Sequence, residues 1–182
     1  METITTIKTR RSVRKFTDYK LTSSQFHQLI DITRWAPSWK NAQIVRYHLV
    51  QNNELIQKIN EETMTFPWNH SFVGDAPNLI IVSFKKGIVG FTKDGEYETL
   101  KKDAWQMFDT GVAAQTLCLA AHDMGFGTVI LGIFDEVKLH DLLQLPDDEV
   151  IATVIPIGVP NEEPKIPRKK DVFEISLKKD EL

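Results

Sequence analysis

Gly111-Val-Ala-Ala-Gln-Thr-Leu-Cys-Leu-Ala-Ala121 is the stretch around which the rest of this 182-residue chain must be arranged. It forms the second half of a helix predicted from about Asp103 to Met124, which Gly125 is placed to close in a left-handed conformation. The stretch is apolar nearly all round, so a helix made of it must be buried on most faces. A domain of this size can rarely surround a helix, and the sequence therefore predicts that a second subunit covers part of it.

The segments on both sides of this helix mix strands and helices without regular βαβ alternation. Strands are predicted at Val45–Gln51, Asn78–Phe84, Thr128–Ile133 and Val150–Gly158, and short helices at Asn53–Thr63 and Asp135–Leu145. An earlier helix begins after Thr22, where Gln25 completes a capping box, and it ends before Pro37 because the residue before proline avoids the α region. These elements predict an α+β fold in a single domain over residues 1–182.

Two stretches carry no regular pattern. Residues 66–72 are aromatic and predicted to be irregular, whereas residues 85–102 contain three glycines and many lysines and are predicted to form a surface excursion that could act as a lid. The candidate lid aromatics are Phe66, Trp68, Phe72 and Phe91, although each is more often a packing residue.

Composition and charge narrow the class of partner. Apolar residues make up 42% of the chain and the formal net charge is −3, so neither a nucleic acid nor an anionic membrane is expected as a partner. No apolar run reaches the roughly 20 residues that span a bilayer. The single cysteine, Cys118, excludes an internal disulfide and fits a cytoplasmic setting. Lys179-Asp-Glu-Leu182 matches an ER-retention signal, but without an entry signal a chance match is the better interpretation.

Two basic stretches lie far apart in the sequence. Lys8-Thr-Arg-Arg-Ser-Val-Arg-Lys15 holds five cationic residues among eight and no acidic one. Guanidinium forks beside a hydroxyl suit a phosphate or the electron-rich edge of a cofactor. The second stretch is Pro164-Lys-Ile-Pro-Arg-Lys-Lys170. On its own, each stretch is more typical of a solvated turn or tail.

Two other stretches could contact a ligand. Ala36-Pro-Ser-Trp-Lys-Asn-Ala-Gln43 offers short polar side chains that could read the edge of a heterocycle, although a polar turn is the better interpretation of this stretch alone. Gly125-Phe-Gly-Thr-Val-Ile-Leu-Gly-Ile133 is not a dinucleotide fingerprint, because it follows a helix and precedes a strand. Gly132 would instead let a flat ligand approach the backbone. Histidine and serine spacings predict neither a metal site nor a hydrolase triad.

Taken together and in this order, the four stretches resemble the nitroreductase family of FMN-dependent oxidoreductases. The Arg-Arg-Ser-x-Arg opening, the Ala-Pro-Ser-x-x-Asn-x-Gln loop, the buried helix 113–121, the Gly-x-Gly-Thr strand and the closing Pro-Arg-Lys all match, and the resemblance covers nearly the whole chain. Two departures concern the shape of the pocket. Ile44-Val45 stands where the family often has Pro-Trp, and Trp39 is bulky where small residues are common.

The resemblance implies a mixed, mainly antiparallel sheet flanked by helices, in an intertwined homodimer with FMN at the interface. It also implies that the C-terminal tail, from about residue 160, packs on the partner subunit. Arg10 and Ser12 are implied to bind the FMN phosphate and ribityl chain, and Arg14 the pyrimidine edge. The other implied FMN-binding residues are Arg11, Pro37, Ser38, Asn41, Gln43, Leu131, Gly132, Arg168 and Lys169.

The implied reaction is a hydride relay. NAD(P)H reduces FMN at flavin N5, and an electron-poor acceptor such as a nitroaromatic or a quinone then reoxidises it. The relay needs no side-chain acid, so no catalytic residue is named. Two alternatives remain: a flavin-binding carrier or sensor without turnover, and a family member with a different flavin reaction.

Overall fold

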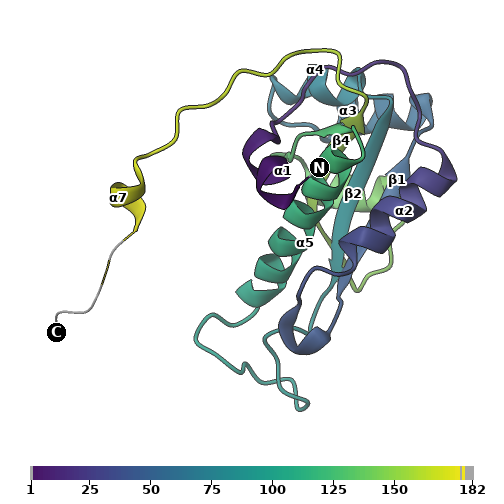
Figure 1. Cartoon of the computed structure of the whole chain (residues 1–182). Coiled ribbons are helices and arrows are strands. Elements are labelled where there is room, and N and C mark those ends of the chain that lie inside the picture. Colours follow the sequence, from purple (N-terminus) through teal and green to yellow (C-terminus); the bar gives the residue numbers. More distant parts are fainter. Residues whose placement is uncertain (1, 177, 179–182) are drawn as a thin grey trace.

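A computed structural model of the chain describes residues 2–176 and 178. A four-stranded antiparallel sheet in the order β1-β2-β4-β3 has helices packed on both faces (Figure 1). The strands are β1 (Val45–Val50), β2 (Asn78–Lys85), β3 (Gly127–Thr128) and β4 (Glu149–Gly158). The helices are α1 (Thr3–Thr9), α2 (Ser23–Thr33), α3 (Asn53–Thr63), α4 (Asn69–Gly74), α5 (Ala104–Asp123), α6 (Glu136–Leu143) and α7 (Val172–Ile175). The predicted α+β fold is confirmed.

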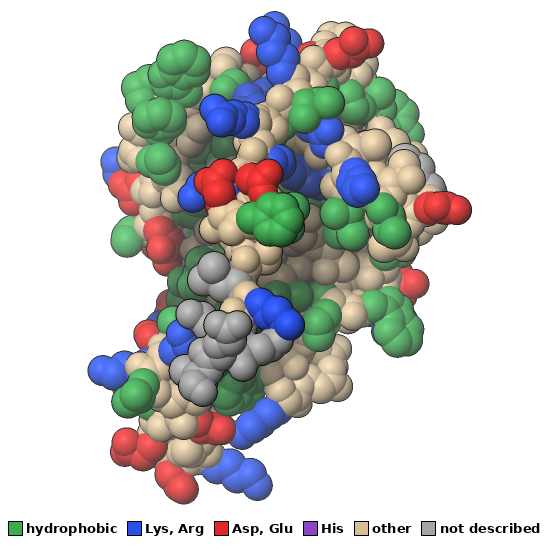
Figure 2. Space-filling view, turned by 60° about the vertical axis from the view of Figure 1, so that its left-hand side comes forward, with side chains coloured by type: hydrophobic (Ala, Val, Ile, Leu, Met, Phe, Trp, Pro, Cys, Tyr) green, Lys and Arg blue, Asp and Glu red, His purple; other side chains and the backbone are tan. Residues whose placement is uncertain are grey.

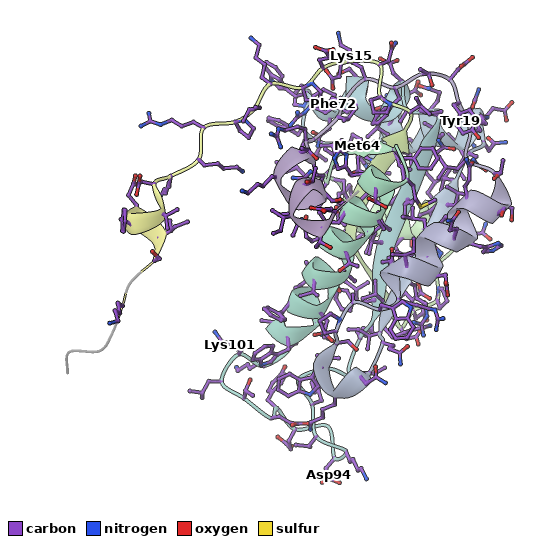
Figure 3. The ribbon with its side chains drawn as sticks, in the orientation of Figure 1. Lys15, Tyr19, Met64, Phe72, Asp94 and Lys101 are labelled. Atoms are coloured by element: carbon purple, nitrogen blue, oxygen red, sulfur yellow. The ribbon has the colours of Figure 1, made fainter. Side chains whose placement is uncertain are left out.

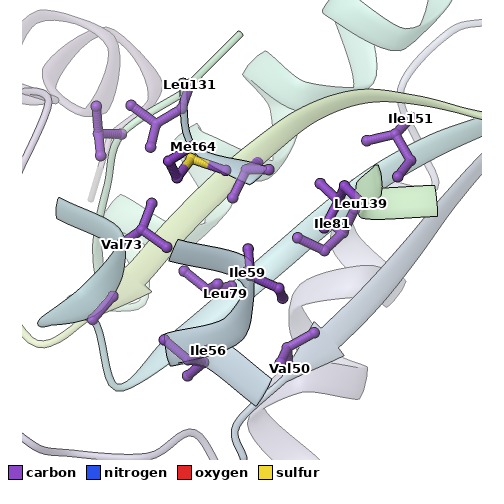
Figure 4. Close-up of a cluster of buried hydrophobic side chains, with 13 residues drawn as sticks. Val50, Ile56, Ile59, Met64, Val73, Leu79, Ile81, Leu131, Leu139 and Ile151 are labelled. Carbon is purple, nitrogen blue, oxygen red and sulfur yellow. The ribbon is translucent and has the colours of Figure 1, made fainter. Parts of the chain in front are cut away.

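The central strand β2 separates two apolar cores. Because side chains alternate along a strand, Leu79 and Ile81 point into the core beneath α3, α4 and α6 (Figure 4), while Ile80 and Val82 point into the core beneath α2 and α5. All four side chains are fully buried. Burial of each contributes about 1.5–3 kcal/mol to folding. The two cores fix α5 and the loops at its ends against one rigid sheet.

The long helix α5 ends as predicted, and one chain alone does not bury all of its faces. Gly125 has a φ of +87°, and Phe126 N–H and Gly125 N–H donate to Ala121 O and His122 O, which is a Schellman closure. One face of α5 packs on the sheet. The opposite face leaves Met107 and Phe108 51% and 61% exposed. The chain alone therefore leaves an apolar helix face uncovered.

Two predicted elements differ from the structure. The strand predicted over 128–133 is confined to Gly127–Thr128. Val129 N–H donates to the carbonyl of Pro156, but Pro156 has no N–H to donate in return, so the ladder ends there. Pairing resumes only as an isolated bridge from Leu131 to Val154. The stretch predicted as irregular contains α4. That helix has no side-chain cap, and its stability comes from Val73, which is fully buried in the core.

Opposed glycines let the N-terminal segment cross the sheet. Gly127 of β3 pairs with Gly158 of β4, and a Cβ at Gly127 would lie only 2.6 Å from Val13. The close approach permits Val13 N–H to donate to Thr128 O at 3.0 Å. Beyond the crossing, Asn161 N–H donates to Lys15 O at 2.9 Å. The segment after α1 is thereby fixed beside the start of the C-terminal tail.

The C-terminal tail leaves the body after Pro160 and carries α7 away from it (Figure 1). Val172 and Phe173 of α7 are 66% and 86% exposed. The tail therefore presents apolar side chains that the body of its own chain does not cover. Lys179-Asp-Glu-Leu182 lies outside the described residues. None of the helices in the described part of the chain has the length and apolar content needed to cross a bilayer.

Candidate functional site

The two basic stretches line one cavity. It has a volume of about 930 Å³ and lies between the body and the tail, where Lys and Arg side chains surround a hollow (Figure 2). Ser12, Gln115 and Glu162 contribute polar groups to its wall. Its cationic lining residues are Lys8, Arg10, Arg11, Arg14, Lys165 and Lys169. The structure therefore brings the N-terminal stretch and Lys169 of the same chain to one cavity.

The cations of this cavity have no acidic partner. Within residues 2–176 and 178, none of the six lies within salt-bridge distance of an Asp or Glu. Glu162 enters the cavity, but its Oε1 accepts the backbone N–H of Arg14 at 2.5 Å and that of Lys15 at 3.2 Å. Glu163 also lines the cavity, but six cationic residues against two acidic ones leave its wall net positive. A net positive wall favours a bound anion, so the cavity has the chemistry of an anion site.

The three arginines of the N-terminal stretch are placed differently. Arg11 Nη1 donates to the carbonyls of Lys8 and Arg10 at 2.7 and 2.8 Å, which turns this guanidinium back on its own backbone. The Arg14 guanidinium lies 5.4 Å from the centre of the Phe72 ring. Arg10 has neither a hydrogen bond from its side chain nor an ion pair in the described chain. Arg10 is thus the arginine best placed to bind an anion.

The two predicted residues of the tail differ in the surfaces they line. Lys169 lines the basic cavity, whereas Arg168 does not. Both residues line a shallow groove along the tail, together with Lys170 and Asp171. Of the two, Lys169 is therefore the one that reaches the cavity of Arg10 within one chain.

The predicted loop of residues 37–43 lines a second cavity, of about 390 Å³, between α2, β1 and α5. Pro37, Ser38 and Gln43 line it together with Asp109 and Tyr47. Burial raises the pKa of Tyr47 to about 12, so its phenol keeps its proton at neutral pH. The exposed Asn41 of the same loop does not line this cavity. The predicted site residues therefore divide between two cavities of one chain.

The backbone of this loop is strained. Lys40, Asn41 and Gln43 have φ values of +48°, +57° and +50°. The left-handed region costs a residue other than glycine on the order of 1 kcal/mol, less for asparagine. Backbone strain of this kind persists only where surrounding contacts impose it, and it concentrates at functional sites.

Three contacts impose the loop conformation. The Asp109 carboxylate accepts the Trp39 N–H at 2.8 Å, and Ser38 Oγ accepts the Gln43 N–H at 3.1 Å. Lys40 Nζ meets the Glu98 carboxylate of the surface excursion at 2.6 Å. Asp109 is only 3% exposed, and its burial raises the pKa of the carboxyl while the Trp39 N–H lowers it. The loop is therefore attached to α5 by a buried acid and to the excursion by an exposed ion pair.

An aromatic cluster joins the loop to the base of the excursion. The Trp39 and Trp105 rings lie 4.8 Å apart, and the Trp105 and Phe108 rings 5.4 Å apart. Trp105 Nε1 donates to Thr99 Oγ1 at 2.7 Å, whereas the buried Trp39 Nε1 has no partner in the described chain. Trp39 thus fills the space between loop and excursion.

Leu131 and Gly132 lie beyond the end of β3. Leu131 is buried, and its N–H and carbonyl both bond to Val154, at 2.9 and 3.0 Å. Gly132 is exposed, and a Cβ there would meet no atom within 4 Å. Within the described part of one chain, no close contact therefore requires glycine at position 132.

The candidate lid aromatics do not form one group. Phe72 and Lys15 lie at one end of the molecule, whereas Asp94 and Lys101 of the excursion lie at the other (Figure 3). Phe91 belongs to the excursion, where its ring packs on Tyr97 at 4.9 Å. A lid made of all four predicted aromatics is excluded within one chain.

Two residues of the site were not predicted from the sequence. Glu162 holds the backbone of Arg14 and Lys15, and Asp109 holds that of Trp39. Glu162 lies four residues after the end of a predicted strand, which is a weak signal. Asp109 stands out as an acid two residues before the apolar half of α5. In both cases the donor is a backbone N–H, so the side chain of the donor residue does not reveal the contact.

Comparisons with known proteins agree with this fold. The model of the family described as the nitroreductase family matches residues 7–159. The chain belongs to the nitroreductase family. It is 32% identical over 171 residues to a putative NADH dehydrogenase/NAD(P)H nitroreductase of Methanothermobacter thermautotrophicus, covering 90% of this chain and 80% of that one.

Two other similarities extend over most of the chain. It is 28% identical over 195 residues to an FMN reductase [NAD(P)H] of Bacillus subtilis, covering 100% of this chain and 77% of that one. An FMN-dependent nitroreductase structure from Clostridium difficile superposes with a TM-score of 0.76 at 23% identity, covering 98% and 99% of the two chains. This second similarity shows the fold alone.

Proposed function

We propose that this chain is an FMN-dependent oxidoreductase that takes a hydride from NAD(P)H and delivers it to an electron-poor acceptor, such as a nitroaromatic or a quinone. The observation that carries the proposal is the basic cavity, which is lined by Ser12 and by six cations that form no ion pair within the described residues. Membership of the nitroreductase family and the names of the relatives, FMN reductase and NAD(P)H nitroreductase, support the same cofactor and reductant.

The residues of the cavity fit the phosphate end of FMN. Arg10 and Lys169 offer unpaired charges, and Ser12 offers a hydroxyl. The volume of about 930 Å³ leaves room for more than a phosphate group. Arg14 lies in the same wall, and we assign it to the pyrimidine edge of the flavin. Leu131, Gly132 and Arg168 are proposed to complete the site from the body and the tail.

We also propose that the site is completed by a second copy of the chain. Pro37, Ser38, Asn41 and Gln43 are assigned to the flavin bound by the partner, because their loop lies apart from the basic cavity of its own chain. The exposed face of α5 and the exposed apolar side chains of α7 supply surfaces that a partner would cover. The tail from about residue 160 would then pack on that partner.

The protein's part in the reaction is to bind, to orient and to supply fixed charge. Bound FMN supplies the hydride chemistry. A cation fixed beside the pyrimidine edge favours the anionic reduced form of the flavin. We assign this role to Arg14, whose backbone N–H is held by Glu162 and whose guanidinium lies 5.4 Å from the centre of the Phe72 ring. The buried Cys118 takes no part, since burial raises the pKa of its thiol and keeps it protonated.

Anaerobic reduction of the purified protein tests this proposal. We expect it to bind FMN, and NADH or NADPH to bleach the flavin absorbance within seconds in the absence of oxygen. Arg10→Ala should weaken FMN binding at least tenfold, whereas the exposed control Lys138→Ala on α6 should not change it. A yellow protein that neither nicotinamide bleaches would instead identify a flavin carrier. A protein that fails to bind FMN at all would exclude both functions.

A further inference from the structure

The carboxylate of Asp109 attaches α5 to the loop of residues 37–43. Its Oδ2 accepts the Trp39 N–H at 2.8 Å, and no other hydrogen bond to this side chain is present in the described chain. Trp39 directly precedes Lys40 and Asn41, the first two residues in the left-handed region. The direction of the Trp39 N–H therefore sets the orientation at which the chain enters the strained part of the loop.

We propose that Asp109 is a positioning residue, which acts through the Trp39 N–H to hold Ser38 and Asn41 in the conformation that contacts the flavin. The inference rests on the proposed function, because it assigns these loop residues to an FMN site. Asp109 itself lies on the face of α5 that packs against the loop, and it lines the smaller cavity, not the basic one. Its influence on the flavin is therefore indirect.

A purely structural role explains the residue less well. Burial of the carboxyl raises its pKa, so the ionised form makes the folded state less stable at neutral pH than a neutral acceptor would. An asparagine would accept the same N–H without that cost. What the carboxylate adds is a stronger, charge-assisted bond, which suits a backbone that must be held in an unfavourable conformation.

The remaining contacts of the loop do not replace this bond. Ser38 Oγ accepts the Gln43 N–H and closes the loop on itself, but it does not attach the loop to the body. The Lys40–Glu98 pair is formed with the excursion, and Lys40 is 65% exposed. Exposed pairs contribute little and are screened by salt. Asp109 is thus the only buried polar attachment of residues 39–41 to a helix in the described chain.

The experiment compares four versions of the FMN-loaded protein: wild type, Asp109→Asn, Asp109→Ala and the control Asp103→Asn. The control removes the same charge from an exposed position at the start of α5. FMN affinity, the rate of flavin reduction by NADH and hydrogen exchange at the Trp39 amide are measured for each. Asp109→Leu, which fills the space without accepting a bond, replaces Asp109→Ala if that variant does not fold.

We expect Asp109→Ala to weaken FMN binding at least tenfold or to slow reduction at least tenfold, and to speed exchange of the Trp39 amide. Asp109→Asn keeps an acceptor for the Trp39 N–H but loses the charge, so it should fall between wild type and Asp109→Ala on the three measurements, and Asp103→Asn should match wild type. Normal FMN binding and reduction in Asp109→Ala would overturn the proposal. So would an Asp109→Asn variant as impaired as Asp109→Ala, because the hydrogen bond would then not be what matters. If wild type itself binds no FMN, the proposed function fails, whereas Trp39 exchange still reports on the loop.

Discussion

Gly127→Ala tests whether the crossing of the N-terminal segment over β3 sets the geometry of the basic cavity. The added methyl would lie 2.6 Å from Val13 Cβ and Cγ2 and 2.9 Å from Cγ1, whereas ordinary contact begins near 3.4 Å. Val13 is buried and cannot turn away, so the two segments must separate by close to 0.8 Å, the difference between 3.4 and 2.6 Å. The separation stretches the Val13–Thr128 hydrogen bond and displaces Ser12 next to it.

The size of the effect follows from these contacts. Overpacking of a well-packed core costs about 1–3 kcal/mol, and we expect a loss of about 2 kcal/mol in the free energy of unfolding. Arg10, Ser12 and Arg14 flank the displaced Val13 and line the basic cavity. A loss of about 1.4 kcal/mol in binding corresponds to a tenfold weaker affinity. We therefore expect FMN to bind at least tenfold more weakly.

The measurements are urea unfolding and titration with FMN followed by flavin fluorescence. Gly74→Ala is a matched control, because its methyl would also approach an atom at 2.6 Å, but that atom is Nδ2 at the end of the Asn60 side chain, and neither Gly74 nor Asn60 lines the basic cavity. Adding Val13→Ala to Gly127→Ala should recover part of both losses, since it removes Cγ1 and Cγ2. Wild-type stability and affinity in Gly127→Ala would refute the reasoning.

Three further predictions concern other parts of the site. Glu162→Ala should weaken FMN binding several-fold while Glu162→Gln restores most of it, as titration would show, because either side-chain oxygen accepts the backbone N–H groups; equal losses in both variants would contradict this. Phe108→Glu, which puts a charge on the exposed face of α5, should yield a monomer on size-exclusion chromatography with light scattering if that face is a subunit interface; an unchanged mass would exclude it. Burial raises the pKa of Asp109, so the native state holds this proton more tightly than the unfolded state, and wild type loses stability as the pH rises from the ordinary value of 3.8 through the raised one. Asp109→Asn should therefore gain stability over wild type across that interval in urea unfolding, and a constant difference from pH 3 to 8 would count against the shift.

Local signals predicted the elements best where they agreed with tertiary packing. The bounds of α3 match the prediction, because Asn52 caps the helix and Ile56 and Ile59 lie on one buried face. The capping box of Thr22 and Gln25 is present at the start of α2. By contrast, α4 depends on the burial of Val73, and the shortening of β3 depends on Pro156 of another strand. Both effects depend on contacts with other parts of the chain, so the local sequence of α4 or β3 does not predict them.

The cationic residues of the candidate site could be predicted from the sequence. The acidic residues that hold its backbone, Asp109 and Glu162, could not. Cationic side chains are visible in the sequence, and the structure brings Arg10 and Lys169 to one cavity. The division of the predicted residues between two cavities depends on the fold, and so does the absence of Arg168 from the basic cavity that Lys169 lines. Asp109 and Glu162 accept hydrogen bonds from backbone N–H groups. Every residue except proline has such a group, so the sequence does not indicate which residue is the donor.

The two cavities lie at different positions along α5, and their spacing indicates how one flavin could contact both. Asp109 lines the smaller cavity and Gln115 lines the basic cavity, and six residues of helix separate them by about 9 Å along the axis. The exposed face of α5 lies between them around Gly111, where a methyl group on the Cα would meet no atom of a neighbouring element within 4 Å. A two-fold axis passing near Gly111 would pack this face of α5 against the same face of the partner's α5. The part of one helix around Asp109, which contacts the loop of residues 37–43, would then face the part of the other helix around Gln115, which lines the basic cavity. We therefore propose that two chains, each incomplete, form two equal sites, and that Gly111 allows the helices to approach closely. Full FMN-dependent activity in a monomeric Phe108→Glu variant would exclude this arrangement, because one chain would then suffice.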